Sequence, residues 1–152
     1  MGGLNHDFLL LSARASPYTD YMKWVNNGQA VQIHDDVIGY IRDSLKWITC
    51  HDPANRMRKH EGLNRYGPTI IKEDEAIVAH KIFDAWARLF SNGPVKVQLT
   101  GGYTWIESQE TGSYSVINVD RDEIVHRLRT LADYTKQVAE SKDRLFVLHL
   151  GI

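Results

Sequence analysis

The sequence lacks most of the features that reveal a function directly. Its 152 residues contain one cysteine, Cys50, so no disulfide can form within the chain and nothing suggests an oxidising compartment. The 18 basic and 19 acidic residues leave a formal net charge of −1, which provides no field to attract nucleic acid. The chain has neither a run of about 18 apolar residues nor a basic, apolar N-terminal signal. We therefore expect a cytoplasmic protein that binds neither membranes nor nucleic acid.

The motifs of the common catalytic and cofactor-binding classes are also absent. The sequence contains no phosphate loop GxxxxGK[ST], no dinucleotide fingerprint GxGxxG, no GxSxG elbow, no HExxH and no paired CxxC. No motif assigns the chain to a known family, and we predict that it has no cofactor.

Several side chains have the chemistry of metal ligands or nucleophiles, but their spacing is not typical of such sites. His51, Asp52 and His60 lie in an aperiodic segment, and His80 lies within a helical pattern, so no metal motif is matched. Cys50 directly precedes His51, and neighbours in sequence do not ordinarily face each other. We expect a buried cysteine, and we predict no catalytic residue and no metal.

The composition is that of a folded domain. Hydrophobic residues make up 43% of the chain and charged residues 24%, whereas disordered chains combine low hydrophobicity with high net charge. No internal repeat and no linker of biased composition divides the sequence. We therefore expect residues 1–152 to form one globular domain.

Hydrophobic periodicity, capping residues and glycine or proline stops predict nine elements. The expected helices span 17–26, from Asp35 or Asp36 to about Cys50, 76–90, and from Asp120 to about Val138. The expected strands span 7–12, 69–72, 95–105, 113–119 and 145–150, the last apolar enough to be covered on both faces. This order, β-α-α-β-α-β-β-α-β, predicts an α+β fold with a mixed or mostly antiparallel sheet packed by about four helices.

Glycines interrupt one of these strands. The apolar alternation from Val95 to Trp105 continues through Gly101-Gly102, which indicates one long strand bent at the glycines. Gly101 would leave a gap on the apolar face. We hypothesise that an aromatic ring such as that of Trp86 fills it.

His149 is a polar residue in the apolar C-terminal strand. A buried imidazole needs a hydrogen-bond partner. A backbone carbonyl or Tyr134 would supply one, and the alternative is that His149 lines a cleft. We favour the first interpretation.

The segment 51–67 is the best candidate for a functional region. It is long, aperiodic and cationic, because four basic residues oppose only Asp52 and Glu61. Arginine side chains match the geometry of carboxylate and phosphate oxygens. The candidate residues for binding an anion or a partner are Arg56, Arg58, Lys59, His60, Arg65, Tyr66 and the neighbouring Trp47. The alternative is a solvated loop whose charges pair with nearby carboxylates.

These observations favour a binding protein over an enzyme. We expect a non-enzymatic bacterial protein, such as an inhibitor or immunity-type partner of a toxin, that recognises an acidic protein through the 51–67 segment. The alternative is an enzyme acting on an anionic small molecule, with Arg56, Arg58 and Arg65 holding the anion and His51 or His60 as general acid or base.

Overall fold

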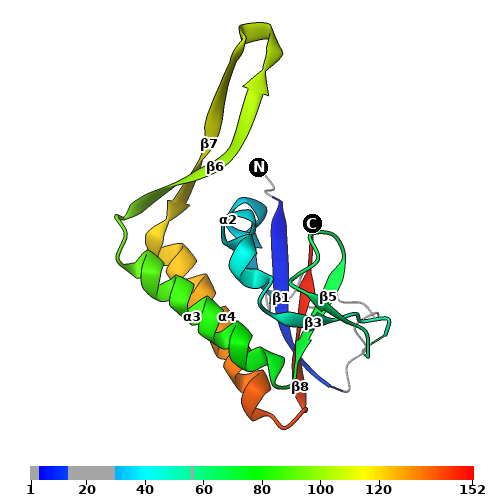
Figure 1. The fold of residues 1–152 in the computed structure, drawn as a ribbon. Helices are drawn as coiled ribbons and strands as arrows, with labels where there is room; N and C mark the ends of the chain where they lie inside the picture. Colours follow the sequence, from blue (N-terminus) through cyan, green and yellow to red (C-terminus); the bar gives the residue numbers. More distant parts are fainter. Residues whose placement is uncertain (1–3, 14–29, 56) are drawn as a thin grey trace.

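The computed structural model describes residues 4–13, 30–55 and 57–152 (Figure 1). The elements are β1 (Asn5–Ser12), β2 (Val31–His34), α2 (Asp35–Leu45), β3 (Thr49–His51), β4 (Lys59–Glu61), β5 (Pro68–Lys72), α3 (Glu75–Ser91), β6 (Lys96–Ile106), the 3-10 turn η1 (Glu107–Gln109), β7 (Thr111–Asp120), α4 (Arg121–Glu140) and β8 (Leu145–Leu150). They form a single α+β fold, as predicted. No helix in these described ranges is long and apolar enough to cross a membrane.

Six strands form one sheet in the order β2-β1-β8-β5-β3-β4, and every neighbouring pair is antiparallel. The prediction of a mostly antiparallel sheet is therefore confirmed. β8 lies inside the sheet between β1 and β5, where Phe8 and Thr69 both pair with His149. Burial on both faces explains why this C-terminal strand is almost continuously apolar.

The helices cover one face of the sheet. α3 and α4 lie side by side along it, and α2 packs beside β1 (Figure 1). α4 begins as predicted, because the Asp120 side chain accepts a hydrogen bond of 3.0 Å from the backbone N–H of Glu123. Between helices and sheet lies the main core, in which each fully buried Ile, Leu or Phe contributes about 1.5–3 kcal/mol. Its largest fully buried side chains are Phe8, Ile33, Ile41, Leu45, Ile48, Ile71, Phe83, Leu128 and Leu131. A smaller buried cluster, including Leu9, Ile70 and Leu148, lies on the other face.

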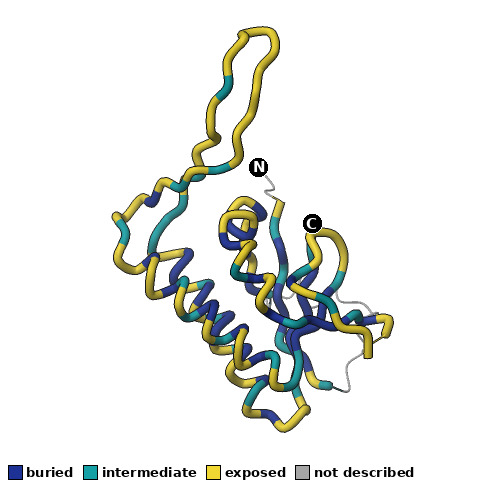
Figure 2. Tube along the Cα trace, in the orientation of Figure 1, coloured by how far each residue is buried: buried dark blue, intermediate teal, exposed yellow. Residues whose placement is uncertain are grey.

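The remaining two strands, β6 and β7, form an antiparallel arm that extends away from the body (Figure 1). The predicted hairpin is present, and its register shifts between Thr100 and Tyr103, at the two glycines. Figure 2 shows that most of the arm is exposed. The gap at Gly101 faces Ser115 rather than Trp86, so our hypothesis about the ring was wrong. Trp86 instead donates a hydrogen bond of 2.8 Å to Ser44 on α2.

Other details of the predicted order need correction. α2 ends at Leu45, and Ile48 and Cys50 are buried from a turn and from β3, so they only coincidentally continue the helical spacing. β2, β3 and β4 were not predicted. The expected helix over 17–26 lies outside the described residues, which contain three α-helices where we predicted about four in the chain.

Candidate functional site

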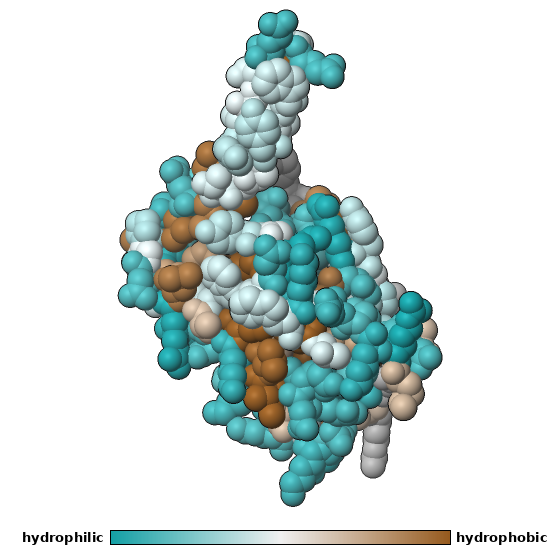
Figure 3. Space-filling view, viewed as in Figure 1, coloured by the Kyte–Doolittle hydropathy of each residue, from teal (hydrophilic) through white to brown (hydrophobic). Residues whose placement is uncertain are grey.

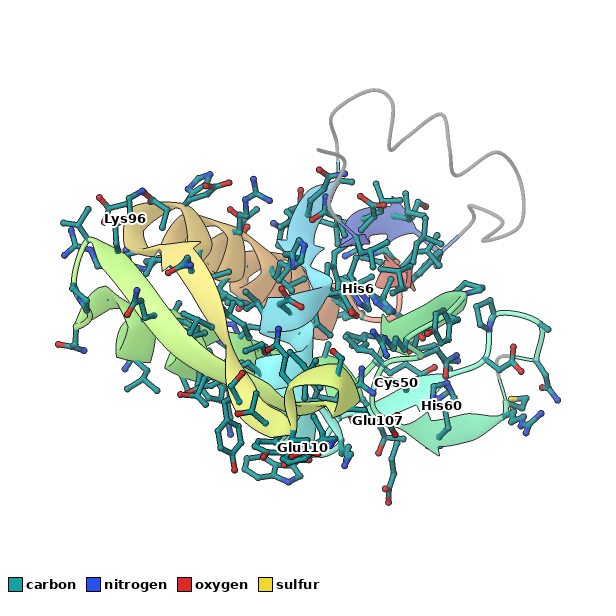
Figure 4. All side chains as sticks on the ribbon, turned by 90° about the horizontal axis from the view of Figure 1, so that it is seen from above. His6, Cys50, His60, Lys96, Glu107 and Glu110 are labelled. Atoms are coloured by element: carbon teal, nitrogen blue, oxygen red, sulfur yellow. The ribbon has the colours of Figure 1, made fainter. Side chains whose placement is uncertain are left out.

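A chain of four polar side chains runs from the interior to the surface beside α2. His6 on β1 and His149 on β8 are stacked and fully buried, with 2.7 Å between His6 Nδ1 and His149 Nε2. His6 Nε2 donates to Oδ1 of Asp35 at 2.9 Å, and Asp35 Oδ2 accepts from Nη2 of Arg65 at 2.7 Å. Figure 4 shows His6 in the interior beside α2. These four hydrogen-bonded side chains therefore connect two central strands, the first residue of α2 and the 51–67 segment.

Burial and hydrogen bonding determine the protonation states of Asp35, His6 and His149. Burial raises the pKa of Asp35, but hydrogen bonds from His6 and Arg65 and the charge of Arg65 outweigh it, so that the net effect is a lowered pKa. Because an ionised carboxylate only accepts hydrogen bonds, His6 Nε2 carries a proton. Burial, together with the electrostatic influence of His6, holds the pKa of His149 well below its ordinary value. His149 is therefore neutral, and its Nδ1 has no hydrogen-bond partner within the described structure.

Arg65 is the only one of these four side chains that is substantially exposed. Both imidazoles are fully buried, and the Asp35 side chain is 9% exposed. Arg65, in contrast, has a side chain that is 44% exposed. Its backbone is also fixed, because its carbonyl accepts a hydrogen bond of 2.9 Å from the N–H of Ile152. A partly exposed guanidinium is thus held in place by a buried carboxylate.

Arg65 lines a cleft of about 440 Å³ between α2 and the root of the arm. The α2 residues around it are Asp35, Asp36, Gly39, Tyr40 and Arg42, and the arm contributes Thr100, Gly101, Gly102, Ser115 and Ile117. A second cleft of about 430 Å³ is lined by parts of α2, β7 and α4, including Val116, Ile117 and Ile124. The root of the arm is therefore bordered by open space that a ligand can enter.

The predicted site residues do not all gather at one place. Arg58 is exposed, and Nζ of Lys59 lies 3.3 Å from Oε1 of Glu75. Neither Arg58 nor Lys59 lines the cleft at Arg65. Tyr66 is 67% exposed, with the Arg65 guanidinium 5.6 Å from its ring centre.

The remaining predicted site residues are His60, Trp47 and Arg56. His60 on β4 is partly buried, and its Nε2 has no partner in the described part of the chain. Trp47 is 71% exposed. Arg56 lies outside the described residues.

Three other reactive side chains considered from the sequence are buried or partly buried within the fold. Cys50 is fully buried, and its burial, with the negative charge of Glu75, raises the pKa of the thiol to about 12, so it is no nucleophile at neutral pH. His51 is also buried. His80 donates a hydrogen bond of 2.7 Å to the carbonyl of Ala132, which links α3 to α4. Over the described ranges, no three His, Cys, Asp or Glu side chains gather in a way that could hold a metal ion.

Sequence reasoning missed two features of this site. His6 is separated from His149 by 143 positions, and only the predicted burial of His149 indicated that it needed a partner. Arg42 lines the cleft, but it lies in a helix outside the segment singled out for its charge. We expected His149 to bond to a backbone carbonyl or to Tyr134. This prediction was wrong, because the hydrogen-bond partner of His149 is His6.

No protein-family model matches this chain, and no curated protein or solved structure matches it. Any function of the protein must therefore be inferred from its own geometry.

Proposed function

We propose that this protein is a non-enzymatic protein-binding domain and that the β6–β7 arm makes the principal contact. The observation that carries the proposal is the set of large hydrophobic side chains left exposed on a projecting element. Their exposed fractions are 56% for Tyr103, 56% for Trp105, 41% for Ile106, 62% for Tyr114 and 62% for Val116. Tyrosine and tryptophan are enriched in protein interfaces and in their energetic hot spots.

The arm is built to present these rings rather than to bury them. Tyr103 and Tyr114 pair across the two strands, with ring centres 5.1 Å apart in an edge-to-face arrangement. The Tyr103 ring also lies over Gly112, where a Cβ would come within 2.4 Å of the ring carbon Cζ. This cross-strand packing restricts the rotamers of the two rings, which lowers the entropic cost of binding.

The same face of the body also exposes apolar side chains. Figure 3 shows hydrophobic residues over α3 below the pale aromatic side chains of the arm. Ile77, Val78 and Leu89 on α3 are 42%, 41% and 60% exposed. A partner that contacts the arm and this face at once would bury a larger area than the arm alone offers.

We propose that the cationic 51–67 segment supplies a second, electrostatic contact to an acidic partner of the inhibitor or immunity type. Arg58 supports this role because it is exposed and forms no ion pair with any described residue. Trp47 and Tyr66 are the exposed aromatic residues of this region. Contacts between exposed charges mainly raise the association rate and weaken with added salt.

Site-specific crosslinking tests the proposal. A photoreactive amino acid at position 105 is expected to give a defined protein adduct in the native host, whereas the same group at the exposed α4 position Lys136 gives none. With the partner purified, Trp105→Ala should weaken binding by about 2 kcal/mol, roughly thirtyfold. Arg58→Gln should mainly slow association at low salt. An adduct pattern that is identical at positions 105 and 136 would contradict the proposal.

A further inference from the structure

We infer that the cleft between α2 and the root of the arm is a binding site for an oxyanion, a carboxylate or a phosphate, held by Arg42 and Arg65. The two guanidinium-bearing side chains come from different elements, and both line this cleft and the smaller one of about 120 Å³ next to it. This inference does not rest on the arm's contact with a protein.

The two arginines of the cleft have N–H groups without a side-chain carboxylate partner among the described residues. Arg42 forms no ion pair with any described residue, and Arg65 uses Nη2 for Asp35, which leaves further N–H groups of its fork. Three residues with hydroxyl groups, Tyr40, Thr100 and Ser115, are among those that line the same cleft.

One of the two carboxylates in the cleft is already fully paired. Both oxygens of Asp35 are occupied, one by His6 and the other by Arg65. Asp36 carries the second carboxylate of the cleft, and its side chain is 59% exposed, so solvent and salt screen its charge. Two oxygen atoms of an anionic ligand would satisfy the donors that remain, as in bidentate recognition by arginine.

The bulge in β6 opens the backbone to the same space. Gly101 and Gly102 fall between the paired positions Thr100 and Tyr103, so they lie outside the regular ladder of the arm. A Cβ at Gly102 would meet no atom within 4 Å, which leaves its backbone accessible from the cleft.

Titration with inorganic phosphate tests the site. Backbone amide NMR spectra are recorded with sodium phosphate and with sodium chloride at equal ionic strength. We expect saturable shifts at Gly101 and Gly102 with phosphate alone. Arg42→Gln should weaken the phosphate affinity at least about tenfold, whereas the matched variant Arg129→Gln, an exposed helical arginine on α4 outside the cleft, should change it less than about twofold. Both substituted arginines are exposed, so neither change disturbs the core.

A hexaglutamate peptide as a second probe identifies the source of the oxyanion. Tighter binding of the peptide than of phosphate, weakened by Trp105→Ala, would assign the cleft to an acidic segment of a protein partner. Tighter binding of phosphate, insensitive to Trp105→Ala, would assign it to a small phosphorylated ligand. If neither probe gives saturable shifts, or if Arg42→Gln and Arg129→Gln behave alike, the inference is overturned.

Discussion

Replacement of Asp35 by alanine should destabilise the protein far more than replacement of its neighbour Asp36. Asp35→Ala removes the acceptor for His6 and Arg65 and leaves the N–H of a fully buried imidazole without a partner. An unsatisfied buried donor, here the His6 N–H, costs about 1–3 kcal/mol. Loss of the charged hydrogen bond between Arg65 and Asp35 adds at most about 1.5–3 kcal/mol, because Arg65 is partly exposed. We expect a net loss of about 3 kcal/mol, a large part of a typical folding free energy of 5–15 kcal/mol.

Asp36→Ala is a matched control for this change. Both aspartates lie in the first turn of α2, so each loses the same favourable interaction with the helix dipole, about 0.3–1 kcal/mol. Asp36 has an exposed side chain, and in Asp36→Ala the backbone N–H at this position can still donate to the capping Nδ1 of His34. Urea denaturation followed by circular dichroism measures the two free energies of unfolding. Equal losses for the two variants would refute the structural role assigned to the buried chain.

Three further predictions concern other parts of the fold. Gly101→Ala should lower the stability of the arm by about 1–3 kcal/mol, because its Cβ would lie 2.1 Å from Ser115 Oγ, whereas Gly102→Ala should be tolerated; hydrogen exchange of the arm amides distinguishes them. Because the pKa of His149 is lowered in the folded protein, this imidazole binds a proton on acidification in the unfolded state but not in the native state. The free energy of unfolding should therefore fall as the pH drops below about 6.5, by up to about 1.4 kcal/mol per pH unit, and urea titrations should give a shallower dependence for His149→Asn. Cys50 should react with a thiol reagent only under denaturing conditions, and rapid labelling of the native protein at pH 8 would contradict its burial.

The elements that the sequence predicted correctly are those that local patterns determine. α3, α4 and β8 have long apolar patterns that packing in the fold reinforces. β3 and β4 are three-residue strands at one edge of the sheet, and no periodicity is detectable over so short a length. β2 does alternate, with Val31 and Ile33 buried, but four residues are too few to separate this pattern from chance.

The candidate site was less predictable because it depends on contacts between distant parts of the chain. The positive charge of the 51–67 segment was evident, yet one of its residues, Arg65, reaches the cleft only because a buried carboxylate on α2 holds it. That carboxylate in turn depends on His6, whose ring is fixed by pairing of the first and last strands. No local pattern encodes such a chain.

The arm shows where a local pattern was read correctly but its environment was not. Alternating apolar residues from Val97 to Trp105 are typical of a strand with one face in a core, and Val97, at the root, is indeed buried. Beyond the bulge the same alternation continues, but the body no longer covers it, so Tyr103 and Trp105 are more than half exposed. A two-stranded ribbon without such cover is marginally stable at best. Large apolar side chains at this position contribute little to the core of the described fold. The proposed protein contact explains them, because a partner surface would pack against these side chains and cover them.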